Sequence, residues 1–335
     1  MSERRFDPLS GEWRTFATDR QERTPLPAPD RCPLCPGRSG DEAEVLGPFQ
    51  IATFDNRYPA FEAASPPPAP RATDLAPAAP ARGAAEVVVW SSDHSRTLAQ
   101  LPVEHLDRLI EVWAERYDEL GRRDDVAYVL IFENKGAVVG ATLPHPHGQI
   151  YAYPDVPPRV ASTLQVARQH LQRTGRCVAC EVGGFEHSAG VRAVAADGST
   201  LAFVPFAPRF PYEVRIQPLR HATSLLDLTD PERASLARVL HAVLTAFDGL
   251  FGFPLPYVLA LHQSPTHGPQ WLDVAHLHIE LTPPHRAPDK LKHLAGSELA
   301  AGAYIGDVAP EAAAEALRTA AGRPSPDRPS TRTGR

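Results

Sequence analysis

The sequence predicts an α+β fold made of two tandem copies of one unit, each an antiparallel sheet with a packed helix. The prediction depends on three landmarks that each occur twice at nearly the same separation, since internal repetition decides the architecture before any single motif does. The landmarks are a histidine ending a β-rich run, a Tyr-Val-Leu segment and a His-x-His segment. Their first residues lie 127, 129 and 131 residues apart, in the pairs His94 and His221, Tyr128 and Tyr257, and His145 and His276.

An amphipathic helix follows the first landmark in each copy. Apolar residues recur with helical spacing from Leu106 to Leu120, and the same pattern returns from Leu236 to Leu250. We expect Asp230 as the N-cap of the second helix, with a proline in its first turn. A buried strand with the Tyr-Val-Leu segment follows each helix, and each copy then closes on the strand that carries His-x-His. Because every element of one copy has a counterpart in the other, we expect two structurally similar halves.

The copies are predicted to occupy residues 1–154, which would be catalytic, and 155–320, which would be structural and contribute sugar-phosphate contacts. Residues 62–86 are rich in Pro and Ala and hold little that could fill a core, so they should form an exposed, extended loop. Residues 321–335 contain Pro, Arg and Ser without periodicity and should form a disordered tail.

Composition excludes several classes of protein. Of 335 residues, 43% are hydrophobic and 22% charged, which excludes a disordered or fibrous chain. The net charge is -6 and no basic block is present, so we expect no nucleic acid or membrane partner. No apolar run approaches the roughly 18 residues that span a bilayer, and the start MSERRF is charged where a signal peptide is apolar. We therefore expect a cytoplasmic protein with small-molecule partners.

The 4 cysteines form two Cys-x-x-Cys pairs, one in each copy. Two thiolates at this spacing can share one zinc ion, which then needs two further ligands. The order of the repeat supplies them from histidines, and the predicted sets are Cys32, Cys35, His94 and His145, and Cys177, Cys180, His221 and His276. Four protein ligands leave no position for substrate, so these ions would be structural. The alternatives are a redox motif, or reduced buried thiols beside unrelated histidines.

The segment from His145 to Gln149 carries the predicted chemistry. On a strand, alternate side chains share a face, so His145, His147 and Gln149 project together. With His145 on the metal, the imidazole of His147 can attack phosphorus and hold the product as a phosphoramidate. Gly148 would let a phosphate approach the backbone. Gln149 can stabilise charge on a phosphoryl oxygen but cannot deliver a proton, which favours transfer between phosphates over hydrolysis.

The second copy has Glu280 where the first has Gln149. A carboxylate there would repel a phosphate, so we predict that only the first copy is catalytic. Two further histidines of this copy, His262 and His278, could join His276 in a metal cluster or be ordinary core or surface residues. We favour the second interpretation.

FENKG at 132–136, followed by PHPHGQIYAY at 144–153, resembles the galactose-1-phosphate uridylyltransferase family, the transferase branch of the histidine-triad superfamily. The resemblance extends to RRFDPLSGEW at 4–13, FDNRYPAF at 54–61 and KHLAGSE at 292–298. It implies that His147 becomes uridylylated and that Gln149 holds the phosphoryl group. The implied reaction is ping-pong: UDP-glucose uridylylates the enzyme and releases glucose 1-phosphate, and galactose 1-phosphate then accepts the UMP.

The resemblance also implies substrate contacts. Arg20 and Arg23 would lie near phosphates, Asn56 near the nucleotide, and Asn134 and Thr142 around the reacting phosphate and the sugar. The alternative for the arginines is a solvated surface charge, and for Asn56 a bond to its own backbone.

The segment from Lys292 to Glu298 would contact the sugar phosphate in the active site of the neighbouring subunit, which implies a homodimer. Otherwise Lys292 would be a surface lysine. Where enterobacterial-type members have a tyrosine and a glutamine, this chain has Ser297 and Tyr304, and no glutamate near Thr163 matches their ligand to the second metal. The first two departures lie in, or a few residues after, the segment that would recognise the sugar.

Three rival functions follow. The duplicated Cys-x-x-Cys pairs resemble plant-type relatives, some of which are ADP-glucose phosphorylases that would use the same covalent histidine. Those relatives commonly have Ser at the position of Gly148, which favours the uridylyltransferase. The second rival is a histidine-triad nucleotide hydrolase, which Gln149 opposes. The third is a non-catalytic, zinc-stapled nucleotide-binding or interaction module.

Overall fold

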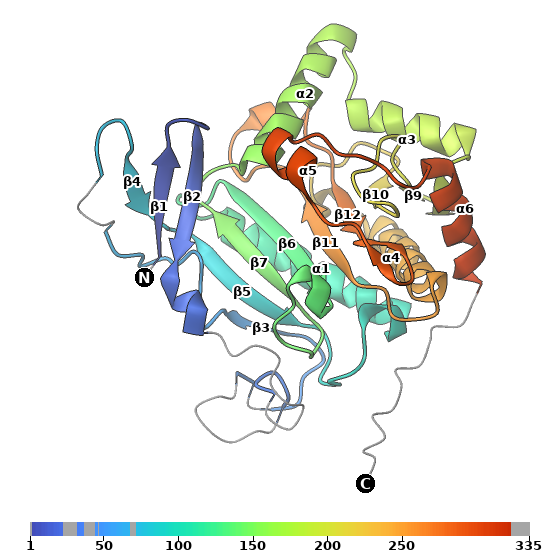
Figure 1. The fold of residues 1–335 in the computed structure, drawn as a ribbon, viewed down its shortest axis with the longest axis horizontal. Coiled ribbons are helices and arrows are strands. Elements are labelled where there is room, and N and C mark those ends of the chain that lie inside the picture. Colours follow the sequence, from blue (N-terminus) through green and yellow to red (C-terminus); the bar gives the residue numbers. More distant parts are fainter. Residues whose placement is uncertain (1, 23–31, 37–43, 46, 68–71, 323–335) are drawn as a thin grey trace.

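The computed structural model describes residues 2–22, 32–36, 44–45, 47–67 and 72–322. A nine-stranded antiparallel sheet crosses the whole molecule (Figure 1). Its strands, in spatial order, are β3 (Ala52–Asp55), β5 (Ala84–Val89), β7 (His147–Tyr153), β6 (Tyr128–Lys135), β11 (Tyr257–His262), β12 (His278–Thr282), β10 (Val214–Pro218), β9 (Thr200–Phe203) and β8 (Ala193–Asp197).

The order of the strands confirms the α+β class and the duplication. β6 and β11 pair at the centre, with Glu133 opposite Leu259, and the same order of elements continues outward on both sides of this pair. β7 and β12 are therefore counterparts, as are β5 and β10. The two predicted sheets are joined into one because each copy would otherwise leave the unpaired N–H and C=O groups of a long edge strand at its centre.

One face of the sheet carries the main hydrophobic core. α1 (Val103–Gly121) and α4 (Asp230–Leu250) lie side by side on it, and α6 (Pro310–Ala321) packs on α4. The predicted apolar positions of α1 are buried, as are those of α4 except the half-buried Leu250. The N-cap of α4 is Thr229 rather than Asp230, because the carboxylate of Glu232 accepts the Thr229 backbone N–H at 2.9 Å and so sets the helix start one residue earlier.

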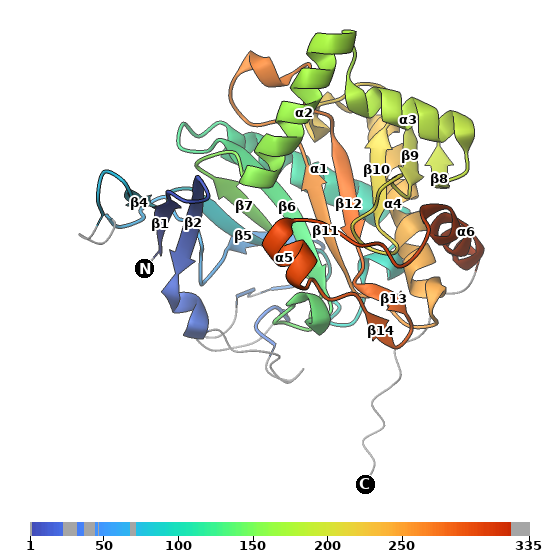
Figure 2. The same ribbon diagram turned by 45° about the horizontal axis from the view of Figure 1, so that its top comes forward.

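The opposite face is covered unevenly. α2 (Pro158–Thr174) and α3 (Val178–Ala189) lie over the second copy, and α5 (Gly296–Ala301) follows the small sheet of β13 (His285–Ala287) and β14 (Lys290–Leu291) (Figure 2). Over the first copy lies the three-stranded sheet of β2 (Glu12–Ala17), β1 (Ser2–Asp7) and β4 (Ala78–Pro80). Short 3₁₀ helices are η1 (Thr18–Glu22), η3 (Leu98–Gln100), η4 (Ala137–Val139), η5 (Leu225–Asp227) and η6 (Pro269–Trp271).

The predicted loop at 62–86 is wrong at its C-terminal end. β4 pairs with β1, and Ala81, Ala84 and Ala85 are buried. The alanine-rich sequence suits a place where two sheets approach closely: a Cβ on Gly83 would lie 2.1 Å from the Ala152 carbonyl oxygen. In the predicted tail, Ala321 is the last residue of α6, and 323–335 lie outside the described residues. Among the described residues, no helix combines the length and apolar character needed to cross a membrane.

Candidate active site and metal clusters

The strand β7 presents its functional side chains on the face away from α1. Ile150 and Ala152 are fully buried in the core on one side, so the alternating residues His147, Gln149 and Tyr151 point to the other side. Gly148 has no room for a side chain, since a Cβ would lie 2.7 Å from Cζ3 of Trp90 and 3.0 Å from the Phe132 carbonyl oxygen. The glycine therefore permits the close packing of Trp90 behind the strand.

The imidazole of His147 is held by the backbone that leads into its strand. Its Nδ1 lies 2.8 Å from the carbonyl oxygen of His145, a bond in which the ring nitrogen must be the donor. The proton of the neutral ring is thus fixed on Nδ1, and the lone pair is on Nε2. This is the tautomer that a nucleophile needs, with Nε2 as the attacking atom.

Gln149 is linked to two further side chains. The Tyr151 hydroxyl donates to Gln149 Oε1 at 3.2 Å, and Arg20 Nη1 donates to the Tyr151 hydroxyl at 3.0 Å. A cavity of about 210 Å³ opens at this point. It brings together five of the predicted site residues, and its lining is Arg20, Phe132, Asn134, Gly140, Ala141, Thr142, His147, Gln149 and Tyr151. Tyr151 is not among the residues predicted from the sequence, although the same alternation that pairs His147 with Gln149 also places it on their face.

A second cavity of about 190 Å³ is also lined by His147 and extends to Glu133, Lys135 and Thr97. Burial raises the pKa of Glu133 to about 7, against the opposing effect of the nearby Lys135 ammonium. The Tyr257 hydroxyl donates to the Glu133 carboxylate at 2.8 Å. The His147 side chain therefore lines both cavities.

Other predicted residues lie outside these cavities. The Asn56 side chain accepts the Tyr58 backbone N–H at 2.9 Å, as its alternative interpretation expected, and lines neither hollow. Lys292 is buried, so its interpretation as a surface lysine is wrong. Its Nζ lies 3.3 Å from Oε1 of Glu298, and neither side chain lines the cavities around His147. Arg23 lies outside the described residues.

The first predicted metal set is assembled in the fold. The ligand atoms of Cys32, Cys35, His94 and His145 all lie within 4.8 Å of one another. Sulfur-to-Nδ1 separations are 3.8 and 3.6 Å from His145 to the two cysteines, and 3.3 Å from His94 to Cys35. Tetrahedral zinc, with bonds of about 2.3 Å to sulfur and 2.0 Å to nitrogen, places such ligands about 3.5 Å apart. The cluster thus has the dimensions of a closed four-ligand metal site.

The second set repeats this geometry. The ligand atoms of Cys177, Cys180, His221 and His276 also lie within 4.8 Å of one another, with sulfur-to-Nδ1 separations of 3.5 to 3.7 Å. In both clusters a backbone carbonyl oxygen accepts a hydrogen bond from the Nε2–H of a ligand histidine, at 2.8 Å for His145 and 3.1 Å for His276. That bond places the proton on Nε2 and leaves Nδ1 to ligate. Both clusters can hold a metal ion.

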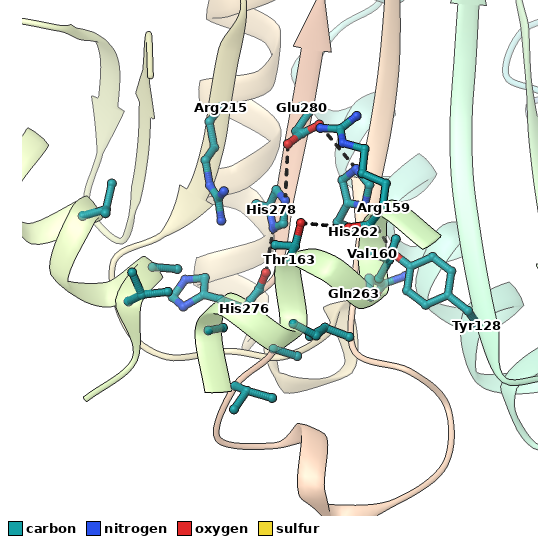
Figure 3. A pocket seen from close by; sticks show the side chains of 17 residues that line it. Tyr128, Arg159, Val160, Thr163, Arg215, His262, Gln263, His276, His278 and Glu280 are labelled. Atoms are coloured by element: carbon teal, nitrogen blue, oxygen red, sulfur yellow. Dashed lines mark hydrogen bonds and ion pairs between the residues drawn. The ribbon is translucent and has the colours of Figure 1, made fainter. Parts of the chain in front are cut away.

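The counterpart of the active site in the second copy is a cavity of about 160 Å³ under α2 and α3 (Figure 3). His278 Nδ1 lies 2.7 Å from the His276 carbonyl oxygen, which repeats the arrangement at His147. Glu280 stands where Gln149 stands in the first copy, and Arg159 and Arg209 bond its carboxylate at 2.6 and 2.9 Å. The site that would have to hold a phosphate is therefore occupied by an ion-paired carboxylate.

Two of the three histidines that line this cavity, His262 and His278, do not join the cysteine cluster. His262 and His278 lie with Glu280 instead, while His276 turns to the cysteines. Although burial opposes ionisation, contacts with His262, His278 and Arg159 hold the pKa of Glu280 well below its usual range. The two guanidinium groups already balance this carboxylate, which disfavours a cation as a further partner.

The comparisons with known proteins agree along the whole chain. The family model described as the N-terminal domain of galactose-1-phosphate uridyl transferase matches residues 1–157, and the model of its C-terminal domain matches 166–325. A galactose-1-phosphate uridylyltransferase of Thermotoga maritima is 38% identical, with 95% of this chain and 98% of that protein covered. The same enzyme of Streptomyces lividans is 35% identical over 96% and 87%. An ADP-glucose phosphorylase of Arabidopsis thaliana is 28% identical over 94% and 92%.

Solved structures give the same ranking. A uridylyltransferase superposes with a TM-score of 0.82 at 36% identity, and the Arabidopsis thaliana ADP-glucose phosphorylase with bound ADP-glucose with 0.72 at 25% identity. Each alignment covers 95% of this chain and 98% of the other. Since two consecutive family models span nearly the full length and full-length relatives exceed 30% identity, the chain belongs to the galactose-1-phosphate uridylyltransferase family of transferase enzymes.

Proposed function

We propose that this protein transfers UMP from UDP-glucose to galactose 1-phosphate by a ping-pong mechanism through a uridylylated His147. The observation that carries the proposal is the bond from His147 Nδ1 to the His145 carbonyl, which leaves Nε2 as a nucleophile at the cavity that also holds Gln149. The full-length relatives named for this activity support the choice of substrates.

In the first half-reaction, His147 Nε2 attacks the α-phosphorus of UDP-glucose. The Nε2–P bond forms while the bond from phosphorus to the bridging oxygen breaks, and glucose 1-phosphate leaves with that electron pair. A phosphate leaving group, with a second pKa near 6, needs no proton. The second half-reaction reverses these events, with an oxygen of galactose 1-phosphate attacking the phosphorus of the intermediate.

The remaining side chains around the cavity bind and orient the reacting group. Gln149 donates its amide N–H to a non-bridging phosphoryl oxygen and has no proton to give to a leaving group, so water gains no acid–base help there. Arg20, Asn134 and Thr142 line the same cavity and are assigned to the phosphates and the sugar. Gly148 is buried and lines neither cavity around His147, and its predicted backbone contact with the phosphoryl group stays part of the proposal. Arg23 and Asn56 keep their predicted roles at the phosphates and the nucleotide.

Zinc is the metal we assign to both clusters, because two thiolates and two imidazoles at tetrahedral spacing match its ligand preference. It would be structural. In the first copy His145 belongs to the cluster and its carbonyl orients His147, so the bound metal would fix the strand that carries the nucleophile.

The assembly we propose is a cytoplasmic homodimer without nucleic acid partners. Lys292 and Glu298 line neither cavity around His147 in their own chain, which is compatible with their serving the site of the neighbouring subunit. The second candidate function is an ADP-glucose phosphorylase using the same histidine. It is favoured by the full-length Arabidopsis relative, but the identity is lower than to the uridylyltransferases.

Intact-mass measurement after incubation with UDP-glucose tests the proposal. The protein should gain one uridylyl group, and the adduct should vanish when galactose 1-phosphate is added. His147→Asn should gain nothing, whereas His278→Asn, the matched change in the second copy, should form the adduct. An adduct from ADP-glucose but not from UDP-glucose would establish the phosphorylase instead.

A further inference from the structure

We propose that Tyr151, anchored by Arg20, is a positioning residue that fixes the orientation of the Gln149 side-chain amide so that its NH₂ group faces the reacting phosphate. The proposal rests on the proposed function, in which Gln149 donates to the phosphoryl group. It explains in addition why the NH₂ group of the amide, and not its oxygen, faces the substrate.

The direction of the hydrogen bonds follows from the chemistry of the three groups. A guanidinium has only donors, so in the 3.0 Å contact with Arg20 Nη1 the Tyr151 oxygen must accept. The single hydroxyl proton then remains for a second partner, and Gln149 Oε1 lies 3.2 Å away. The bonds therefore run from Arg20 to Tyr151 and from Tyr151 to the amide oxygen.

A flipped amide would break this order. Its NH₂ group would face the hydroxyl, and the tyrosine proton would lose its acceptor in the contact. The two ends of a glutamine amide are nearly equal in shape, so only their hydrogen-bond partners decide which end faces a given direction. Because Tyr151 takes the oxygen, the nitrogen is left for the phosphate.

Tyr151 is rigid enough to impose the orientation. Only 8% of its surface is exposed. Its ring meets Phe132 edge to face, with centroids 5.0 Å apart at 88°, and Phe61 lies at 6.0 Å. A ring packed in this way keeps its hydroxyl oxygen fixed beside the Gln149 amide.

Loss of the hydroxyl would make the two amide orientations similar in energy. A hydrogen bond of about 1 kcal/mol corresponds to roughly a fivefold change in a population, and the preoriented donor acts on the charge of the transition state. Tyr151→Phe should therefore slow uridylylation of the enzyme about 3- to 10-fold. The effect should fall on the rate of the chemical step and leave KM for UDP-glucose within about twofold.

The experiment measures single-turnover formation of the uridylyl-enzyme in rapid-quench mixing, for wild type, Tyr151→Phe and Tyr153→Phe. Tyr153 lies on the same face of β7 and packs on Phe61, but lines neither cavity around His147. Its variant should react like wild type. Thermal unfolding of all three proteins checks that the ring packing is kept.

A double-mutant cycle separates positioning from a general structural effect. If Tyr151 acts through the amide, Tyr151→Phe should cost less than twofold in a Gln149→Ala background. Equal losses in both backgrounds, or a wild-type rate for Tyr151→Phe, overturn this inference while the uridylyl-enzyme of the wild type still supports the proposed function. A wild type that forms no adduct overturns both.

Discussion

Lys135 of the first copy and Asp248 of the second are joined across the centre of the molecule. Nζ of Lys135 lies 2.6 Å from Oδ1 of Asp248, and 10% and 1% of the two side chains remain exposed. The same carboxylate oxygen accepts the Leu255 backbone N–H at 3.1 Å, and the ammonium lies 5.1 Å from the centre of the Tyr257 ring. A buried ion pair thus ties α4 to the strand that borders the active site.

Removal of one partner from this ion pair should be costly. Lys135→Met leaves the Asp248 carboxylate buried without its cation, which should lower the free energy of unfolding by about 3–5 kcal/mol in urea titrations. Lys290→Met, at an exposed position of β14, should change it by less than about 0.5 kcal/mol. The combined change Lys135→Met with Asp248→Leu should recover part of the loss. A wild-type midpoint for Lys135→Met would contradict the argument.

Glu133 should make stability depend on pH. Burial raises its pKa from 4.5 to about 7, so between these values the folded chain holds a proton that the unfolded chain has lost. The neutral carboxyl therefore stabilises the fold below about pH 4.5, and its contribution falls as pH rises to 7, by about 3 kcal/mol at most. The difference in unfolding free energy between wild type and Glu133→Gln should trace this fall.

The two metal clusters should differ in their effect on catalysis. Wild type should release two zinc equivalents per chain on denaturation, and Cys32→Ser and Cys177→Ser one each. Because the carbonyl of the ligand His145 orients His147, Cys32→Ser should abolish the adduct from UDP-glucose, whereas Cys177→Ser should retain it and mainly lower thermal stability. Equal loss of adduct in the two variants would refute this division of roles.

Gly148→Ala should destabilise the protein by a clash on the face of β7 opposite to the His147 side chain. The new methyl would meet the Trp90 ring at 2.7 Å, and overpacking of this kind costs about 1–3 kcal/mol. Gly184→Ala, in the helix α3 with nothing within 4 Å, should be neutral or slightly stabilising. Calorimetric unfolding temperatures distinguish these outcomes.

Periodicity in the sequence predicted which side chains share a face of a helix or strand, because the face of a side chain depends only on its spacing from its neighbours in the same element. The alternation along β7 placed His147 and Gln149 together, and the repeat offsets placed the cysteine pairs beside the correct histidines. Neither signal reports which distant segments meet. The bond from Arg20 to Tyr151 spans 131 residues and the pair of Lys135 with Asp248 spans 113, so both depend on packing that no short window contains.

The same limit explains two of the errors, at β4 and at Lys292. β4 exists because β1 offers it hydrogen-bond partners from the other end of the copy, although its Ala-Ala-Pro sequence has little strand propensity. Lys292 is buried because Glu298 and the carbonyl of Ile305 bind its ammonium. In both places tertiary partners outweigh the preference of the residue itself.

The register between β6 and β11, in which five consecutive residue pairs run from Tyr257 with Lys135 to Leu261 with Ile131, makes the duplicated halves mutually dependent. If the two halves were expressed separately, each would expose an edge strand with unpaired backbone N–H and C=O groups. Each half would then have to pair with the other half, or with a second copy of itself, to satisfy these groups. Fusion into one chain places the two halves together each time the protein is made. The second half is therefore needed as the pairing partner of β6 even though Glu280 stands where the first half has Gln149.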